Sequence, residues 1–421
     1  MIFYERTILL NLNSSCRQES RVLTWSLRNV QNYVFNSCLF EFEDVIESVD
    51  DVDLLSPPPY SWLGRSIKRT VINQTQHVKS LSLASVNPYI SAIDLHYEYE
   101  IYFVILDFPW SVSSLNLLKS WRKKCRIAVC YVVEIWTVDL KQMANLMPFF
   151  NQFDLICVGT RHVLEDIQEM AAPPCVFLAP GVDMFKFYNN PQDSRNIDVC
   201  SLGRRSPITH NALIKKAEEQ SFFYYHELTN GSELRVNSHQ SHRTLVSNIL
   251  KSSRYFITNY AKADMPERIA GEYEIGYRFF EGAAAGCVLI GSPPLGEMFQ
   301  QYFDWPDAVI PIELDEPNIA EIIDELDAQP ALLMQIQTNN VVNSLLKHDW
   351  VYRWEQVLTE LDLPATSTME NRKSQLKSMA DSLLTSLEPA KESASKDSSK
   401  SANGTMTGPV AESELVSTVK V

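Results

Sequence analysis

Short apolar runs alternate with amphipathic segments along the middle of the chain. The apolar runs are rich in branched and aromatic residues and lie at residues 100–108, 127–136, 153–160 and 175–180. Runs of this length and composition are typical of strands that are buried on both faces. The segments between them have the apolar spacing of helices and lie at residues 112–124, 139–150 and 161–171. This alternation predicts a parallel sheet that is covered by helices.

A second alternation follows residues 181–196, a stretch of turn residues that we interpret as an interdomain linker. Ser206 as a cap and Pro207 at the first helical position mark the start of its first helix. Strands are expected at residues 197–203, 221–228, 254–259, 287–290 and 308–312. Helices are expected at residues 207–219, 239–252, 316–328, 330–346 and 349–361. The chain therefore predicts two α/β halves.

The two ends of the chain have weaker patterns. Residues 7–12 look like a strand and residues 20–35 like a helix, whereas residues 38–60 give no clear assignment. No aromatic residue follows Trp354, and residues 391–408 have a composition that is typical of disorder. One helical face within this tail gathers apolar residues, which fits a marginal helix or a partner-binding face: Leu376, Met379, Leu383, Leu384 and Leu387.

Composition narrows the class of protein. The length of 421 residues favours two domains, and the formal net charge of -15 disfavours non-specific binding to nucleic acid. The first 20 residues lack a basic start followed by a clean apolar core, and no apolar run approaches the roughly 20 residues that span a bilayer. The eight cysteines are scattered, with no C-x-x-C pair. We therefore expect reduced thiols in a cytoplasmic protein without a metal site.

The segment Glu274–Gly291 concentrates glycine, charge and aromatic residues in a chain that has only 13 glycines. Gly276 stands where a helix begins, and Arg278 lies in its first turn. Free N–H groups and a cation at a helix start suit an anion such as a diphosphate. Glu281 is one turn further along on the same face, where it can accept the hydroxyls of a ribose. The alternative is a surface ion pair of about 0.3–0.5 kcal/mol, with the glycines serving only as turn residues.

Four stretches in the same order resemble a known family. RFFEGAAAGCVLIG (residues 278–291) resembles the donor-nucleotide segment of GT-B glycosyltransferases of group 1, especially the CgeB-like branch. LAPGVDMFKF (178–187) resembles the end of the N-terminal domain of that family, and IDVCSLGRR (197–205) resembles the first strand and Gly-Arg turn of the C-terminal domain. HDWVYRWEQVL (348–358) is similar to the closing helix. The resemblance covers about residues 95–361.

The resemblance implies a GT-B fold, in which two Rossmann-like domains face a cleft. The N-terminal domain (residues 1–190) would bind the acceptor and the C-terminal domain (191–346) the nucleotide-sugar donor. A helix at residues 347–362 would cross back to the N-terminal domain, and residues 363–421 would form a disordered tail.

The resemblance also assigns roles to residues. Glu281 would hold the ribose, and the turn from Gly276 to Arg278 would hold the diphosphate. The turn that begins at Gly203 would neutralise the leaving diphosphate through Arg204 or Arg205, in place of a metal. A basic turn in solvent is the alternative for these two arginines.

One position departs from the family pattern. Many group 1 enzymes have a glutamate eight positions before the ribose glutamate, and Tyr273 stands there in this chain. A shifted loop would bring Glu274 into the catalytic role; otherwise the role is absent.

The function that we predict is a metal-independent transfer of a hexose-type sugar from a nucleotide diphosphate donor to an acceptor hydroxyl. No cofactor is expected, and the acceptor is a polysaccharide, a lipid-linked molecule or a protein. Glu134 and Asp107, at strand ends, are candidate catalytic bases. A nucleotide-sugar epimerase of the same fold and a non-catalytic scaffold or sugar-binding protein remain alternatives.

Three other patterns have less specific interpretations. Asp51 and Asp53 match the D-x-D metal motif of the other glycosyltransferase fold, but their acidic surroundings favour a solvated turn. His239 and His242, near His226, lack a further ligand for zinc. Basic residues at 119–126 suggest a solvated face, or contact with a phosphorylated acceptor or with anionic lipid at the inner face of a membrane.

No G-x-G-x-x-G or G-x-S-x-G motif is present, which disfavours a nicotinamide dehydrogenase and an α/β-hydrolase.

Overall fold

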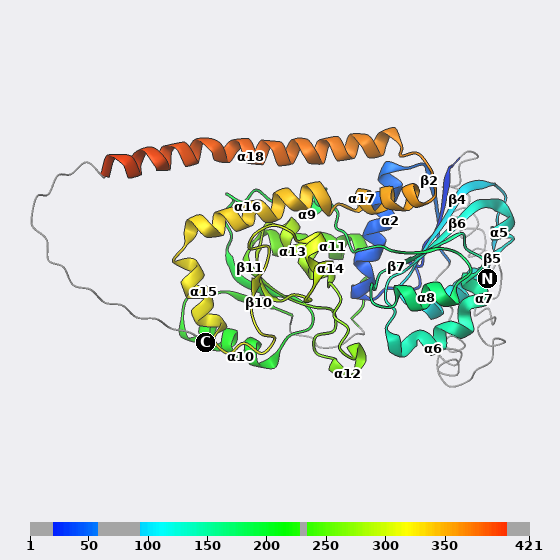
Figure 1. Cartoon of the computed structure of the whole chain (residues 1–421), viewed down its shortest axis with the longest axis horizontal. Helices are drawn as coiled ribbons and strands as arrows, with labels where there is room; N and C mark the ends of the chain where they lie inside the picture. The colour runs from blue at the N-terminus through cyan, green and yellow to red at the C-terminus, as the bar shows by residue number, and fades with distance from the viewer. Residues whose placement is uncertain (1–19, 58–92, 228–233, 402–421) are drawn as a thin grey trace, which may run out of the picture. The chain divides into compact units, whose positions relative to one another are not determined.

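A computed structural model describes residues 20–57, 93–227 and 234–401 (Figure 1). The strand that we predicted at residues 7–12 lies outside these ranges. The described residues fall into two compact units, divided after Ala380. The first unit contains two parallel sheets, each with helices packed against it. The α/β architecture of two Rossmann-like halves is therefore confirmed.

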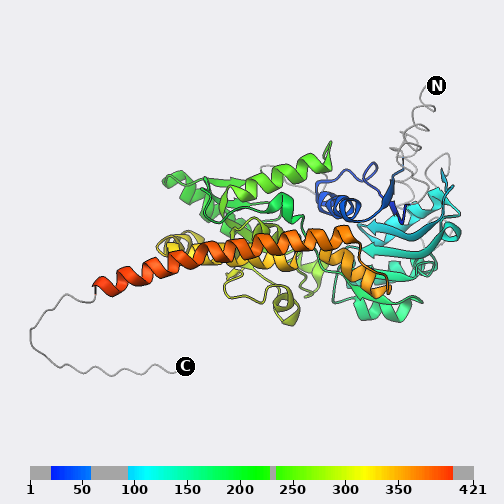
Figure 2. The ribbon, with the colours of Figure 1, turned by 90° about the horizontal axis from the view of Figure 1, so that it is seen from above.

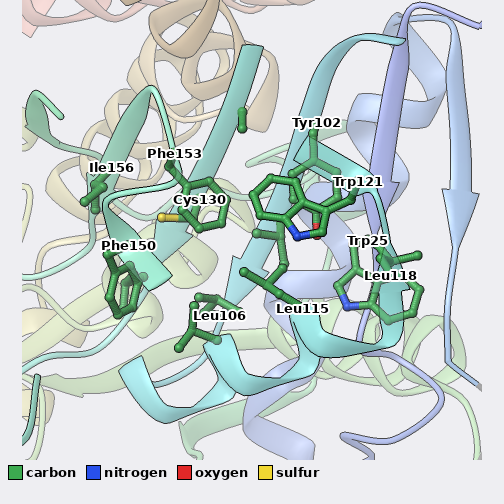
Figure 3. Packing of buried hydrophobic residues seen from close by; sticks show 14 of the residues in the cluster. Trp25, Tyr102, Leu106, Leu115, Leu118, Trp121, Cys130, Phe150, Phe153 and Ile156 are labelled. Atoms are coloured by element: carbon green, nitrogen blue, oxygen red, sulfur yellow. The ribbon is translucent and has the colours of Figure 1, made fainter. Parts of the chain in front are cut away.

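The first lobe is built on a six-stranded parallel sheet with the order β2-β1-β4-β6-β7-β8. Its strands are β1 (Val22–Trp25), β2 (Val52–Leu55), β4 (Tyr99–Leu106), β6 (Cys125–Val132), β7 (Leu155–Val158) and β8 (Cys175–Phe177). A short parallel pairing joins β3 (Ile93–Asp94) to β5 (Leu118–Lys119). Tyr102 and Trp121 pack with ring centroids 4.7 Å apart in the core on one face of the sheet, with Trp25 and Phe153 in the same cluster (Figure 3).

The helix expected at residues 20–35 is wrong, because this segment begins with strand β1. All four residues of β1 are buried, and the strand lies between β2 and β4. A four-residue strand that is buried on both faces shows no alternation, so its pattern resembles one turn of a buried helix. The segment without a clear assignment forms helix α2 (Ser37–Val49), followed by β2.

Two helices expected beside the first sheet are broken into shorter pieces. Residues 112–124 contain the end of the 3-10 helix η2 (Pro109–Leu117), then β5 and the short helix α5 (Trp121–Lys124). Ser120 has a left-handed backbone (φ 57°), which ends any continuous helix there. Residues 139–150 are divided because Pro148 has no N–H to donate to the preceding turn. The pieces are η3 (Thr137–Asp139), α6 (Leu140–Met143), η4 (Ala144–Leu146) and α7 (Met147–Phe150); α8 (Leu164–Met170) follows as expected.

The second lobe is built on a five-stranded parallel sheet with the order β10-β9-β11-β12-β13. The strands are β9 (Ile197–Ser201), β10 (Tyr224–His226), β11 (Ser253–Asn259), β12 (Val288–Ser292) and β13 (Ile310–Pro311). Strand β9 pairs with β10 on one side and with β11 on the other, so the order of the strands reverses direction at β9. The carboxyl ends of β9 and β11 therefore flank the topological switch point, where open parallel sheets bind their ligands.

The second lobe contains the helices α10 (Pro207–Glu219), α11 (His239–Lys251), α12 (Pro266–Ile269), α13 (Tyr277–Ala284), α14 (Glu297–Tyr302), α15 (Ile319–Asp327) and α16 (Pro330–Lys347). The longer helices of the second lobe match the sequence pattern closely, whereas the short helices α12 and α14 were not predicted. Ser206 caps α10 as expected, because its Oγ accepts hydrogen bonds from the backbone N–H groups of Ile208 and Thr209.

Replacing Ser206 with alanine is expected to lower the free energy of unfolding by about 0.5–2 kcal/mol, since two helix N–H groups lose their acceptor. Ser206 Oγ also donates to Asp315 at 2.6 Å, which places the expected loss in the upper part of this range. Chemical denaturation of Ser206→Ala beside Ser206→Thr, which keeps the capping oxygen, would measure the effect. Equal stability of both variants and the wild type would contradict the capping role.

Two glycines near α13 serve the packing of this helix. A Cβ on Gly282 would lie 2.5 Å from Phe256 Cδ1 and 2.6 Å from Leu289 Cδ2, so glycine lets α13 approach the sheet closely. Gly286 has a φ of +69° and ends the helix in a left-handed conformation, as the sequence predicted. The concentration of glycine in this segment is therefore explained in part by close helix–sheet packing.

Helix α17 (Trp350–Glu360) packs against the first lobe. Trp350 stacks on Phe42 of α2 at 4.5 Å, and Trp354 meets Phe103 of β4 edge-on at 5.2 Å. Helix α2 in turn contacts both α17 and α11 of the second lobe (Figures 1 and 2). The short helix α9 (Met184–Phe187) lies in the segment that we interpreted as a linker.

The disorder expected from residue 363 is wrong for the stretch Ser367–Ser401, which forms helix α18. Composition predicted disorder because aromatic residues are absent, yet Met369 and Leu376 are fully buried in the first unit. None of the helices in the described part of the chain is long and apolar enough to cross a membrane. The seven cysteines within the described ranges are free thiols.

Candidate functional site

Loops that follow the strands of the two sheets meet each other. Glu134, after β6 of the first lobe, forms an ion pair with Lys262, which follows β11 of the second lobe. The indole Nε1 of Trp136 donates to the same carboxylate oxygen of Glu134 at 2.8 Å. Close by, Arg268 pairs with Asp139 at 2.5 Å. The predicted candidate base Glu134 thus lies at the junction of the lobes, with its charge matched by a lysine.

His162, in the loop after β7, lies between two carboxylates of the second lobe. Its backbone N–H donates to Glu274 Oε1 at 3.0 Å, and its ring Nδ1 lies 2.5 Å from the same oxygen. Its Nε2 forms an ion pair with Glu272. Each ring nitrogen of His162 therefore faces a carboxylate of the second lobe. The structure therefore places Glu274 at the junction, buried and bonded to the first lobe.

Tyr273 has a different environment from its two acidic neighbours. Its side chain is about half exposed, and its ring meets Tyr260 edge-on at 4.8 Å. The side chain that departs from the family pattern therefore packs on the loop after β11.

The turn after β9 brings three predicted residues to the switch point. Gly203 has a φ of +79°, and its N–H donates to Glu227 Oε2 at 2.9 Å. Arg204 Nη1 donates to both carboxylate oxygens of Asp264 at 2.9 Å, and both side chains are exposed to solvent. Arg205 Nη2 donates to the backbone oxygen of Glu227 at 2.8 Å. The charge of Arg204 is thus offset by a carboxylate, whereas Arg205 donates to a neutral oxygen.

A small hollow opens at the carboxyl ends of β9 and β11. Arg205 and His210 line it, and His210 Nδ1 lies 2.9 Å from Tyr224 Oη, which also faces the hollow. Asn259, the last residue of β11, completes the polar part of its wall. Aliphatic side chains, among them Leu213 and Ile257, form the rest of the wall, so this small hollow is of mixed character.

Arg278 and Glu281 of α13 are ion-paired, but not on the surface. Arg278 Nη1 lies 2.7 Å from Glu281 Oε2, and the Glu281 side chain is 2% exposed. Arg243 of α11 pairs with the other oxygen of Glu281. The surface-pair alternative is therefore wrong, because burial and a second arginine make this a buried network whose only partly exposed end is Arg278, at 27%.

The same network extends into the first lobe. Arg243 donates through Nε at 2.8 Å and through Nη2 at 3.1 Å to Glu41 of α2, which is itself buried. Trp350 Nε1 also donates to Glu41 at 3.3 Å. A carboxylate of the first lobe thus orients an arginine of the second.

Two pKa shifts reflect the charges at this place. Burial alone would raise the pKa of Glu281, but Arg278 and Arg243 outweigh it and lower that pKa to about 2. Burial, with the same two arginines nearby, lowers the pKa of His242 to about 4. Burial and these two arginines together therefore disfavour a further cation at this place.

Gly276 brings the helix start close to the end of β11. It is the N-cap of α13, and a Cβ there would lie 3.2 Å from the backbone oxygen of Asn259. A Cβ on Gly203 would lie 3.9 Å from Arg278 Nη2. The structure therefore brings together Gly203, Gly276 and Arg278, whereas Arg204 is turned to Asp264. The ribose role of Glu281 stays a prediction, since both of its oxygens bind arginines here.

Other sequence candidates have partners of their own. Asp107 is buried and accepts hydrogen bonds from Gln31 at 2.8 Å and Ser111 at 2.6 Å. Asp53 is buried in β2 and accepts from Ser20 at 3.0 Å and Tyr99 at 2.8 Å, so the solvated-turn interpretation is wrong for it. No group of three or more His, Cys, Asp and Glu side chains is arranged to hold a metal ion in the described ranges.

Three of the five basic residues at 119–126 are ion-paired. Arg122 contacts Asp154 at 2.8 Å, Lys124 contacts Glu98 at 3.5 Å, and Arg126 pairs with Glu100. These pairs leave little net charge for an anionic surface, and they favour the solvated-face interpretation.

The sequence analysis missed His162, Arg243 and Glu41. The local signal for Glu41 is its place between Phe40 and Phe42 in the stretch CLFEFEDVI of α2, since a glutamate among core residues needs a buried partner. Nothing local marks Arg243 or His162, because their partners are distant in sequence.

Several solved structures are similar to the chain. Anabaena HepE in complex with UDP-glucose has a TM-score of 0.48 and 12% identity, covering 82% of this chain and 100% of that chain. An alpha-glucosyltransferase in complex with UDP-glucose and DNA containing an abasic site has a TM-score of 0.47 and 11% identity, covering 81% and 99%. The trehalose 6-phosphate synthase from Burkholderia multivorans has a TM-score of 0.45 and 9% identity, covering 82% and 96%. Because these TM-scores lie below 0.5, the site described above does not depend on them.

No curated protein matches the sequence. A family model described as glycosyl transferase-like matches residues 212–359, a stretch that runs from α10 to α17 and contains the whole of α13.

Proposed function

We propose that the chain is a glycosyltransferase that moves a hexose-type sugar from a nucleotide diphosphate donor to an acceptor hydroxyl without a metal, as in the CgeB-like branch of group 1. One observation carries the proposal. The start of α13, the Gly203 turn and the partly exposed cation of Arg278 converge at the switch point of the second sheet. A diphosphate needs this combination of backbone N–H groups, close backbone approach and fixed positive charge.

In the proposed sugar transfer, these groups stabilise the leaving diphosphate. Charge grows on the diphosphate as the bond to the sugar breaks, and preorganised donors lower the barrier at that moment. In the proposed complex, the N–H groups of the first turn of α13 and the guanidinium of Arg278 bind the diphosphate. Arg205 follows the Gly203 turn and would add positive charge beside the diphosphate in the proposed complex.

The acceptor side of the proposed site lies in the first lobe. Glu134, Asp139 and His162 are titratable groups of that lobe that reach the junction. Each is ion-paired across the junction, so acceptor activation would require one of these pairs to open. The acceptor itself is proposed only as a hydroxyl compound.

Replacing Arg278 with glutamine is expected to weaken the binding of a nucleoside diphosphate by about 1.5–3 kcal/mol, the contribution of a hydrogen bond to a charged group. Calorimetric titration with UDP, GDP and ADP would measure the loss. Arg254→Gln is a matched control, because Arg254 is likewise ion-paired and partly exposed but lies near the start of β11, at the end of the strand away from the proposed site. Equal binding by Arg278→Gln and the wild type would exclude this diphosphate site.

Wild-type binding of the same nucleotides is expected to survive EDTA, since arginines and helix N–H groups supply the positive charge. The titration is repeated with chelator and after adding Mg²⁺ or Mn²⁺. Abolition of binding by EDTA, with recovery on adding metal, would contradict the metal-independent mechanism.

A non-catalytic protein of the same fold is the second candidate, and the observation that favours it is Tyr273 at the position of the missing glutamate. A nucleotide-sugar epimerase needs no acceptor and is the third. Slow hydrolysis of UDP-glucose without acceptor would support a transferase, and isomerisation of its sugar would support an epimerase. Binding without either reaction would support the non-catalytic protein.

A further inference from the structure

Buried and half-buried ion pairs link the candidate site to both lobes and to helix α18. Each charged residue in this series contacts one or two residues of opposite charge. In order along the contacts, the residues are Asp349, Arg372, Asp183, Lys186, Glu41, Arg243, Glu281 and Arg278. Arg243 is the point where the first lobe, through Glu41, joins the second, through Glu281.

Because Arg243 binds one carboxylate oxygen of Glu281, only the other oxygen is left for Arg278. In the structure, Arg243 takes Oε1 and Arg278 takes Oε2. Without Arg243, the buried carboxylate would lack a partner on one oxygen, which is costly in an apolar interior. Arg278 already contacts this carboxylate, and satisfying both of its oxygens would draw Arg278 inward, away from solvent.

Glu41 fixes the orientation of Arg243 from the opposite side. It accepts from Nε at 2.8 Å and from Nη2 at 3.1 Å, so Nη1 is left to face Glu281. The guanidinium also lies over the ring of Phe187, 4.7 Å from its centroid. A planar guanidinium held along three directions has one orientation available.

We propose that Arg243 is a positioning residue for the donor site: held by Glu41 of the first lobe, it satisfies one oxygen of Glu281 and thereby keeps Arg278 directed at the diphosphate. This inference rests on the proposed function. It adds that recognition of the donor depends on contact between the lobes, because one of the groups that set the geometry of the site belongs to the first lobe.

The test is a double-mutant cycle on the selectivity for a diphosphate. The measured quantity is the ratio of the dissociation constants of the nucleoside monophosphate and diphosphate, using UMP and UDP, GMP and GDP, or AMP and ADP, whichever diphosphate the wild type binds most tightly. Arg243→Gln, Arg278→Gln and the double variant are compared with the wild type, and Arg254→Gln is the control. A general loss of structure weakens both nucleotides alike, whereas a displaced Arg278 weakens mainly the diphosphate.

Arg243→Gln is expected to lower this selectivity by about five- to tenfold in the wild-type background and by less than about twofold in the Arg278→Gln background, as for two residues that act through one contact. If Arg243→Gln does not fold, the cycle is run with Arg243→Lys. That variant keeps the charge but lacks the planar guanidinium that reaches two carboxylates at once, so the same direction is expected.

Two outcomes would overturn the inference, and they differ from each other. Unchanged selectivity, or equal losses in both backgrounds, would remove the positioning role while leaving the donor site in place. Failure of the wild type to bind any of the three diphosphates would remove the proposed function, and the inference with it.

Discussion

Glu281→Ala is expected to lower the free energy of unfolding by about 3–5 kcal/mol, the usual cost of removing one partner from a buried ion pair. The substitution leaves Arg243 with Glu41 alone and leaves Arg278 without a carboxylate in contact. Arg243 is 3% exposed, so water cannot replace the lost partner. Chemical denaturation with two probes would measure the change.

Two further variants separate the contributions of charge and shape at this position. Glu281→Gln keeps the size and one acceptor oxygen, and it is expected to lose less stability than Glu281→Ala. Glu219→Ala removes the exposed helical pair with Lys215 and is expected to change stability by less than about 0.5 kcal/mol. A loss as small as that of Glu219→Ala would show that the Glu281 network contributes little to stability.

The pKa of Glu281 also predicts how this contribution depends on pH. Its folded-state pKa of about 2 lies below the ordinary value of 4.5, so the unfolded chain binds more protons between these values. The contribution of Glu281 to stability is therefore complete above about pH 4.5 and is lost as the pH falls towards 2. Between those values, the stability of the wild type should fall more steeply with decreasing pH than that of Glu281→Gln.

Local patterns predicted most of the second lobe because each pattern there has a local cause. The cap at Ser206 and the left-handed Gly286 both rest on interactions within a few residues. The secondary structure of the first lobe was less predictable. Strand β1 is short and buried on both faces, and Ser120 and Pro148 interrupt expected helices. Apolar runs of this kind do not distinguish a strand from a helix.

The candidate site was predictable only where its residues are neighbours in the sequence. Arg278 and Glu281 lie three residues apart, and their ion pair was one of two interpretations of the segment. Their burial was not predictable, because it depends on Arg243 from α11 and on Glu41 from α2. Contacts at such sequence distances leave no periodic signal. The contact of His162 with Glu274 was not predictable for the same reason, because 112 residues separate the two.

The largest difference from the sequence analysis concerns the tail, and it leads to a second prediction. A chain ending at residue 365 is expected to be less stable than the full chain by at least about 3–5 kcal/mol, because Asp349 loses its buried partner Arg372. Arg372 Nε and Nη2 donate to the two oxygens of Asp349 at 2.9 and 2.7 Å. Burial already raises the pKa of Asp349 despite this arginine, so the carboxylate would be strongly destabilised without it.

Loss of apolar contacts adds to this effect. Met369 and Leu376 are fully buried, and each buried side chain of this size stabilises the fold by about 1.5–3 kcal/mol.

A chain ending at residue 385 keeps both residues and Arg372. Its free energy of unfolding is expected to lie within about 1 kcal/mol of that of the full chain, since the remaining segment is poor in apolar residues. Denaturation of the two truncated chains, with Arg372→Gln in the full chain as the single-residue comparison, tests the assignment. If the chain ending at 365 were as stable as the chain ending at 385, the first turns of α18 would not be part of the folded core, and the ion pairs of Arg372 would have no energetic role.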